Sequence, residues 1–264
     1  MAWIWAALMP HPPIIIPKIG MGREQEAKIT LEGVAGVTER LKDLGAPDRI
    51  LLLSPHQPYT SGAFAINRAR TVKGGLSRFG AAISFELNTP IPDVNGLTEY
   101  LGANGATVGV TEAGSLDEDQ GSTVPLYFLR ERYGSLPEII LSSPIGLDRR
   151  QAFNLGQKLA PFDDGKKWGL LASGDLSHRL KPGAPAGFSP KGEKFDAAVV
   201  ESLKRSEASL LLDMPRHIID DAGECGMRSV LAMIGMVSYF GGKIDVLSYE
   251  GPYGVGYCNA IWVR

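Results

Sequence analysis

AWIWAALMPHPP, residues 2–13, is the stretch that decides the fold of this 264-residue chain. Its apolar run is too short to cross a bilayer, which takes about 20 residues. No basic segment precedes the run, no small-residue cleavage site follows it, and prolines end it at once. We therefore predict a buried strand over 3–9, followed by a stiff loop that carries His11.

Further apolar runs of strand length occur along the first two thirds of the chain. They are apolar throughout rather than alternating, which is typical of strands covered on both faces, as in a mostly parallel sheet. Stretches with the apolar spacing of helices lie between them. The expected strands are 49–54, 106–111, 138–143 and 168–173, and the expected helices are 22–44, 124–133, 148–160 and 191–212.

The remaining segments fit the same architecture. Residues 60–95 are rich in Gly, Thr, Ser and Arg, and they indicate an excursion with short antiparallel strands. A helix is expected at 226–240, followed by strands at 243–249 and 256–263. We predict one α/β domain over 1–264, with a mostly parallel or mixed central sheet and helices on both faces.

Charge and cysteine content narrow the classes of partner. The formal net charge is −2, and no run of Lys or Arg forms a basic patch, which argues against binding to nucleic acid or to a membrane. Small molecules are the expected partners, and self-association into a homo-oligomer stays open. Two cysteines without CxxC spacing give no disulfide framework, so we expect a reducing, cytoplasmic location.

Three of the four histidines follow predicted strands. His11 comes after the first strand, His56 after 49–54, and His178 after 168–173. Parallel strands would bring all three to the carboxyl edge of the sheet, where open α/β sheets place their sites. A histidine after a strand can also be a simple capping residue, and the residues alone leave the two readings about even. His217 has no such placement.

A third metal ligand would have to come from a distant segment. Glu224 precedes the helix expected at 226–240, where the helix dipole favours an ionised carboxylate. The same acid could serve only the dipole. Cys225 is the competing donor, and its thiolate would favour softer metals. The residues themselves leave this choice open.

Five motifs in order resemble the LigB-type catalytic subunit of class III extradiol dioxygenases, in a superfamily that includes the Memo proteins. The motifs are Met9-Pro10-His11-Pro12-Pro13, Ser54-Pro55-His56, Gly174-Asp175-Leu176-Ser177-His178, Glu224-Cys225-Gly226 and Tyr249-Glu250-Gly251-Pro252-Tyr253-Gly254-Val255-Gly256-Tyr257. No single motif is specific, but their order along nearly the whole chain is.

The resemblance implies a LigB-like fold and a non-haem Fe²⁺ centre that cleaves a catecholic ring with O₂. His11, His56 and Glu224 match the metal ligands of the family, and Zn²⁺ or Mn²⁺ are the alternative metals. His178 matches its acid/base histidine, with Asp175 as the candidate residue that orients it. Ser54, Gln120 and Tyr253 are further candidates for substrate contact, although each could equally satisfy a loop backbone.

Two departures from the family pattern keep other functions open. Gln120 stands where many ring-cleaving members have the histidine of an Asp-His-Gly motif, and an amide cannot exchange a proton near neutral pH. Cys225 resembles a cysteine of Memo-like relatives, so it could replace or join Glu224. The alternatives are a Memo-like metal-binding protein with a signalling or redox role, and a zinc-dependent hydrolase.

Overall fold

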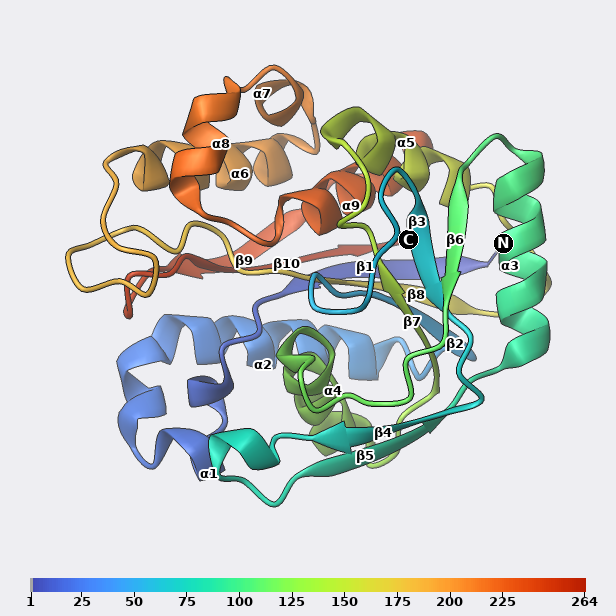
Figure 1. The fold of residues 1–264 in the computed structure, drawn as a ribbon, viewed down its shortest axis with the longest axis horizontal. Helices are drawn as coiled ribbons and strands as arrows, with labels where there is room; N and C mark the ends of the chain where they lie inside the picture. Colours follow the sequence, from blue (N-terminus) through green and yellow to red (C-terminus); the bar gives the residue numbers. More distant parts are fainter. Residues whose placement is uncertain (1) are drawn as a thin grey trace.

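A mixed sheet runs through the middle of the molecule. The computed structural model describes residues 2–264, and within them eight strands follow the order β6–β3–β7–β2–β8–β1–β10–β9 (Figure 1). Strands β7, β2, β8 and β1 are parallel, whereas β3, β10 and β9 are antiparallel to the strands at which they join. The strands are β1 (Trp3–Met9), β2 (Arg49–Leu53), β3 (Phe64–Asn67), β6 (Val108–Thr111), β7 (Glu138–Ser143), β8 (Trp168–Ser173), β9 (Asp245–Glu250) and β10 (Tyr257–Val263).

Strand β1 shows why the central strands are apolar throughout. Trp5 and Met9 belong to the hydrophobic cluster on one face of the sheet, and Trp3 and Leu8 belong to the cluster on the other face. Both faces are therefore removed from water, and each large side chain contributes roughly 1.5–3 kcal/mol on burial. Gly169 of β8 is part of this packing, because a Cβ there would lie 2.1 Å from the ring of Trp5.

Helices cover both faces of the sheet (Figure 1). One face carries α2, α4 and the separate antiparallel hairpin β4–β5, and the other carries α3, α5, α6 and α9 with the short α7 and α8. The long helices are α2 (Lys28–Asp43), α3 (Ile91–Ala103), α4 (Gln120–Tyr133), α5 (Arg149–Leu159), α6 (Lys191–Arg205) and α9 (Met227–Phe240). The shorter elements are η1 (Pro13–Ile15), α1 (Pro17–Gly20), η2 (Arg23–Ala27), β4 (Thr71–Gly75), η3 (Ser77–Phe79), β5 (Ser84–Asn88), α7 (Ser209–Leu212) and α8 (Arg216–Ala222).

Helices α5 and α9 cross at two glycines. A Cβ on Gly156 would lie 1.9 Å from the carbonyl oxygen of Ala232, and one on Gly235 would lie 2.1 Å from that of Phe153. Neither backbone carbonyl can give way easily, so a larger residue at either position would push the helices apart. This contact fixes α9, and with it the loop that precedes α9 and carries Cys225.

The structure confirms the predicted fold class, a mixed α/β sheet with helices on both faces. It differs at 60–95, where β4–β5 is the expected antiparallel excursion but β3 joins the main sheet. Helix α3 was not predicted, because Pro90 and Pro92 at its start obscured the spacing of Val94, Leu97 and Leu101. The single helix predicted over 191–212 is interrupted at Ser206, whose φ of 57° ends α6.

The order of the parallel strands determines where their loops meet. Strand β8 lies between β2 and β1, and all three run in the same direction. The segments that leave their carboxyl ends therefore emerge side by side at one edge of the sheet. Among the helices of residues 2–264, none has the length and apolar character needed to cross a membrane.

Candidate metal centre

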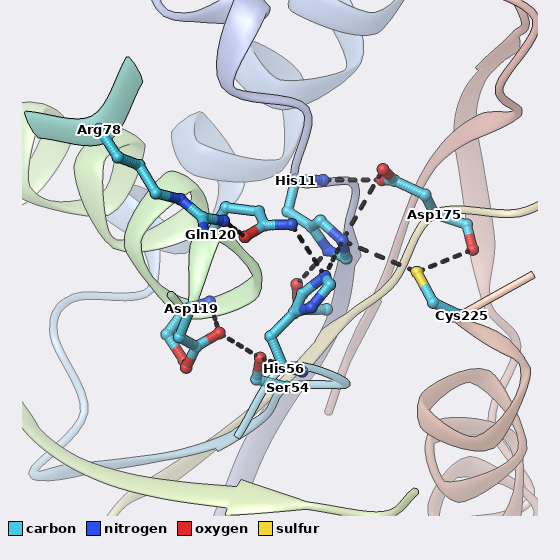
Figure 2. Close-up of polar contacts among 10 residues, drawn as sticks. His11, Ser54, His56, Arg78, Asp119, Gln120, Asp175 and Cys225 are labelled. Atoms are coloured by element: carbon cyan, nitrogen blue, oxygen red, sulfur yellow. Dashed lines mark hydrogen bonds and ion pairs between the residues drawn. The ribbon is translucent and has the colours of Figure 1, made fainter. Parts of the chain in front are cut away.

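Three side chains from distant segments converge at this edge. His11 follows β1, His56 follows β2, and Cys225 precedes α9. The Nε2 atoms of the two histidines are 3.1 Å apart, and the Sγ of Cys225 lies 3.7 Å from Nε2 of His11 (Figure 2). In the described part of the chain, these residues form the group whose donor atoms all lie within 4.8 Å of one another. Two nitrogens and one sulfur at such spacing suit a single metal ion.

His11 is held by two residues that belong to β8 and the loop after it. Its backbone N–H donates to Oδ1 of Asp175 at 2.8 Å, and its Nδ1 is 2.9 Å from Oγ of Ser173. If Nδ1 donates its proton to that hydroxyl, Nε2 is left with its lone pair directed at His56 and Cys225. A hydrogen-bond acceptor on the far nitrogen is the usual device that prepares a histidine for a metal.

His56 is positioned by a buried polar network that centres on Asp119. The backbone N–H of His56 donates to Oγ of Ser54 at 3.1 Å, and that hydroxyl donates to Oδ1 of Asp119 at 2.6 Å. The carboxylate of Asp119 also accepts hydrogen bonds from Gln57 and from Ser122, and it caps α4. Because both carboxylate oxygens of Asp119 accept hydrogen bonds, this network fixes the loop after β2 in one conformation.

Cys225 reaches the centre because two backbones approach closely. A Cβ on Gly174 would lie 2.2 Å from Cα of Gly226, so glycines at both positions let the loop before α9 lie against the loop after β8. The backbone N–H of Cys225 is 3.4 Å from the carbonyl oxygen of Asp175, and its Sγ is 3.6 Å from the same oxygen. The thiol is thereby turned towards His11 (Figure 2).

Burial keeps the donor groups of the centre uncharged. Desolvation lowers the pKa of His11 to about 3 and that of His56 to about 4, so both imidazoles are neutral at physiological pH. Burial also raises the pKa of the Cys225 thiol well above its ordinary value, and it raises the pKa of Asp175 to about 6. A bound metal cation would lower the pKa of the Cys225 thiol instead, because the cation stabilises the thiolate directly.

Glu224, the carboxylate predicted from the sequence as the third ligand, lies outside this group. Its Oε2 accepts a hydrogen bond of 2.7 Å from the backbone N–H of Met227, and its Oε1 is 3.8 Å from Arg228. The side chain therefore serves the start of α9, which was the structural alternative for this acid. The third donor at the centre is Cys225, while a metal-binding role of Glu224 stays a prediction.

The predicted acid/base pair borders the centre. Oδ2 of Asp175 is 3.7 Å from Nε2 of His11, while its Oδ1 holds the backbone of the same histidine. His178 lies close enough to His11 and Asp175 for its charge to affect the pKa of both. Its Nδ1 is buried, and within residues 2–264 it has no hydrogen-bond partner. A nitrogen left without a partner is available to a substrate or to a proton in transit.

The three residues predicted to contact substrate are not equivalent. Nε2 of Gln120 lies 3.2 Å from Nε2 of His56, so this side chain borders the donor group. Ser54 is buried beneath His56, where it supports the loop. Tyr253 donates to the backbone carbonyl of Arg23 at 2.5 Å, an exposed contact between loops. The substrate contacts proposed for these residues stay predictions.

Sequence reasoning missed three residues of the site. Ser173 ends an apolar strand and Asp119 stands beside Gln120, so their positions carried a signal, but neither was assigned a role. Arg78 carried no signal, because it comes from η3 inside the β4–β5 hairpin. Its guanidinium donates to the side-chain oxygen of Gln120 (Figure 2). It also contacts the carboxylate of Glu118.

Comparisons with known proteins place these features in a family. The model of the catalytic LigB subunit of aromatic ring-opening dioxygenase matches residues 5–258. Protein CA_C1420 of Clostridium acetobutylicum is 30% identical over 270 residues, which cover 95% of this chain and 55% of that protein. This chain thus spans about half the length of that relative.

A solved structure shares the fold. The uncharacterized protein JW3007 from Escherichia coli K12 superimposes with a TM-score of 0.66 at 15% identity, and the match covers 98% of this chain and 99% of that one. At this identity the likeness concerns the fold alone. Because the family model covers nearly the whole sequence, the chain belongs to the LigB family of aromatic ring-opening dioxygenase catalytic subunits.

Proposed function

We propose that this protein is a mononuclear metal-dependent dioxygenase that opens a catecholic aromatic ring with O₂. The observation that supports this most directly is the convergence of His11, His56 and Cys225 at one edge of the sheet, in a chain of the LigB family. The catechol and O₂ are its proposed substrates. Fe²⁺ is its proposed metal.

The chemistry of the donors fits iron or zinc better than manganese. Imidazole suits both iron and zinc, and a cysteine thiolate is a soft ligand, whereas Mn²⁺ prefers oxygen donors. Three protein ligands leave further positions open to substrate. A bound Fe²⁺ would supply a point at which the catechol oxygens and O₂ are held next to each other.

Proton transfer is assigned to His178, and Asp175 is assigned a supporting role. A catechol must lose protons as it binds, and a histidine with an unpartnered nitrogen beside the centre can accept one and return it later. Asp175 holds the backbone of His11 and carries a carboxyl with a pKa of about 6, raised by burial. This acid therefore holds the backbone of a proposed metal ligand in place, whereas within residues 2–264 no hydrogen bond joins it to Nδ1 of His178.

Gln120 is proposed as a hydrogen-bond donor to the substrate. Arg78 donates to its side-chain oxygen, so the amide N–H₂ group is the end directed at His56. An amide in this position orients a substrate oxygen but does not move a proton near neutral pH. All proton transfer in this proposal therefore passes through His178.

The test is anaerobic reconstitution with Fe²⁺, followed by oxygen uptake over a panel of catechols. We expect uptake with at least one catechol, and a rate about 10²–10⁴-fold lower in His178→Ala with unchanged iron content. His217→Ala, which changes an exposed histidine outside the group of donor atoms, is the control and should retain full activity. No uptake with any catechol by the iron-loaded protein would reject the proposed function.

A second candidate function is a Memo-like metal-binding protein with a redox or signalling role and no ring cleavage. The presence of Cys225, rather than a carboxylate, in the donor group favours it, because thiolates select softer metals. It predicts metal binding that depends on His11, His56 and Cys225, without oxygen uptake. The same panel of catechols therefore separates the two candidates.

A further inference from the structure

Three tyrosines lie between the end of β9 and the start of β10, and their hydroxyls differ. Tyr249 donates to Oδ2 of Asp196 at 2.8 Å, and Tyr253 donates to the backbone carbonyl of Arg23 at 2.5 Å. Tyr257 is only 3% exposed, yet within residues 2–264 its hydroxyl makes no hydrogen bond. The hydroxyl of a buried tyrosine usually has a partner, so this group calls for an explanation.

The pairing of β10 with β1 brings Tyr257 close to His11. Strand β10 runs antiparallel to β1, with Ala260 opposite Leu8. His11 lies three residues further along the chain from Leu8, and Tyr257 lies three residues before Ala260. The two residues therefore leave the strand pair at about the same level.

Tyr257 also projects from the face of the sheet that leads to the centre. Ile261 belongs to the hydrophobic cluster on the face covered by α2 and α4, and Nδ2 of Asn259 reaches the carbonyl of Thr30 in α2. Side chains two residues apart in a strand share a face, so Tyr257 lies on this face as well. Met9, two residues before His11, belongs to the same cluster.

Gly256 fixes the start of β10 against the loop after β8. Leu176 N–H donates to the carbonyl of Gly256, and Gly256 N–H donates to the carbonyl of Ser177, both at 2.8 Å. A Cβ on Gly256 would lie 1.9 Å from Oδ2 of Asp196, so a larger residue would push the two segments apart. The backbone of Tyr257 is thereby held next to the loop that carries the proposed acid/base residue.

The hydroxyl of Tyr257 can donate a hydrogen bond but cannot act as a base. Burial raises its pKa, and the charges of Asp175 and, more weakly, Cys225 raise it further. The group therefore keeps its proton at physiological pH. Because the effect of a charge falls with distance, the hydroxyl lies close to both of these groups of the centre.

We propose that Tyr257 donates a hydrogen bond to a ligand oxygen that is held at the metal centre beside His11. The proposal rests on the proposed function for the identity of that ligand, a catechol ionised at one oxygen. A protonated hydroxyl stabilises a negatively charged oxygen without taking up a proton, which leaves proton transfer to His178. Gln120 is then the donor beside His56, and Tyr257 is the donor beside His11.

Tyr257→Phe, which removes only the hydroxyl, tests the proposal. Binding of catechol to the zinc-loaded protein is measured by calorimetry, because zinc supports no reaction with O₂. We expect the affinity to fall about 10-fold or more, as for the loss of a hydrogen bond to a charged group. Zinc affinity should not change, and the midpoint of urea unfolding should stay the same or rise, because the lost hydroxyl has no partner in the fold. A purely structural tyrosine would show the opposite pattern.

Tyr133→Phe is the matched control. Its hydroxyl donates to the carbonyl of Leu41 at 3.2 Å, and Tyr133 lies at the opposite end of α4 from Gln120. This variant should keep the affinity for catechol. Tyr253→Phe decides between the two neighbouring tyrosines. A loss of affinity in Tyr253→Phe and not in Tyr257→Phe would assign the role to Tyr253 and overturn the proposal.

A second chelator separates this proposal from the proposed function. Acetohydroxamate binds metals through two oxygens and has no ring to open. If Tyr257→Phe weakens the binding of both chelators while the iron-loaded protein takes up no oxygen with any catechol, the role of Tyr257 is supported and ring cleavage is rejected. Unchanged affinity for both chelators, a loss of zinc, or a variant that does not fold would overturn the role of Tyr257 and leave ring cleavage to its own test. Failure of the unaltered zinc-loaded protein to bind either chelator would also overturn it.

Discussion

The polar side chains at the two ends of strand β2 are arranged in opposite ways: ion pairs lie at one end and uncharged metal-binding groups at the other. At its amino end, Arg49 pairs with Asp93 at 2.9 Å and with Glu138, and Lys166 pairs with the same Asp93. Each charge there has a partner of opposite sign. At the carboxyl end, His56 meets His11 and Cys225, and none of these three groups is a carboxylate or a permanently charged cation.

This contrast indicates that the amino end of β2 has a structural role and that its carboxyl end has a functional one. Opposite charges that close on each other complete the fold and need nothing from outside. Two neutral metal-binding groups gain little from facing one another, and when both histidines carry their proton on Nδ1, the lone pairs of the two Nε2 atoms repel. A fold keeps such an arrangement where the binding of another group offsets its cost. Substitutions at the two ends of β2 test this difference.

The largest effect is expected at the carboxyl end, from the choice between Cys225 and Glu224. Cys225→Ser should weaken zinc or iron binding by more than about 100-fold, which exceeds the usual cost of losing a residue that only supports a ligand. Glu224→Gln should leave metal affinity nearly unchanged and lower the free energy of unfolding by about 1 kcal/mol, because its contact with Met227 is weakened. Competition titration with a metal indicator measures both affinities.

The reverse pattern would contradict the geometry. If Glu224→Gln lost the metal and Cys225→Ser kept it, the carboxylate predicted from the sequence would be the ligand. That result would require Glu224 to leave the start of α9 when the metal binds. Circular dichroism of the metal-free variants shows whether each has retained its fold.

The sequence predicted the part of the site that depends on strand order. Apolar runs predicted β1, β2 and β8, and the placement of His11 and His56 directly after two of them was enough to expect both at one edge. The same reasoning placed His178 at this edge and raised Glu224 and Cys225 as candidates, and the family resemblance added their expected roles. These features depend on local pattern and on the direction of parallel strands.

The remainder of the site depends on contacts between distant segments. Glu224 and Cys225 are adjacent, and the close approach of Gly174 to Gly226 determines which of them faces His11. No periodicity in the sequence indicates that contact. Arg78 reaches the centre through a hairpin whose attachment to 114–117 is equally non-local. The sequence pattern therefore predicts the positions of the strands, but it does not predict the direction in which a loop side chain points.

A smaller effect, confined to stability, is expected at the amino end of β2. Arg49→Met should lower the free energy of unfolding by about 1–3 kcal/mol, because Asp93 is buried and would keep Lys166 alone as a partner. Metal affinity should not change. Arg40→Met removes an ion pair with Asp245 in which both side chains are well exposed, and it should change stability by less than about 0.5 kcal/mol. Urea unfolding measures all three proteins.

A loss of metal binding in Arg49→Met would contradict the separation of the two ends. It would show that the ion pairs at the amino end determine the position of the loop after β2. Equal destabilisation by the Arg49 and Arg40 substitutions would instead show that burial at this end contributes nothing.

The last effect depends on pH and is expected from Asp196, a single carboxyl group just behind the rim. Its carboxyl accepts hydrogen bonds from Ser177 N–H and from the hydroxyl of Tyr249, both at 2.8 Å, and burial raises its pKa to about 7. An unfolded aspartate titrates near pH 3.9, so between these values the folded state holds a proton that the unfolded state lacks. The contribution of this group to stability is therefore complete at low pH and is lost as the pH rises towards about 7.

Asp196→Asn removes that titration while keeping a side chain of the same shape. The difference in unfolding free energy between the unaltered protein and the variant should fall by at most about 1.4 kcal/mol per pH unit from pH 5 to 7, and level off above pH 7. Asp220→Asn, at an exposed position, should give a difference that does not change with pH over this range. A constant difference for Asp196→Asn would mean that Asp196 is already ionised in the folded protein. The carboxyl edge of the sheet would then hold a buried negative charge that has no cationic partner among residues 2–264.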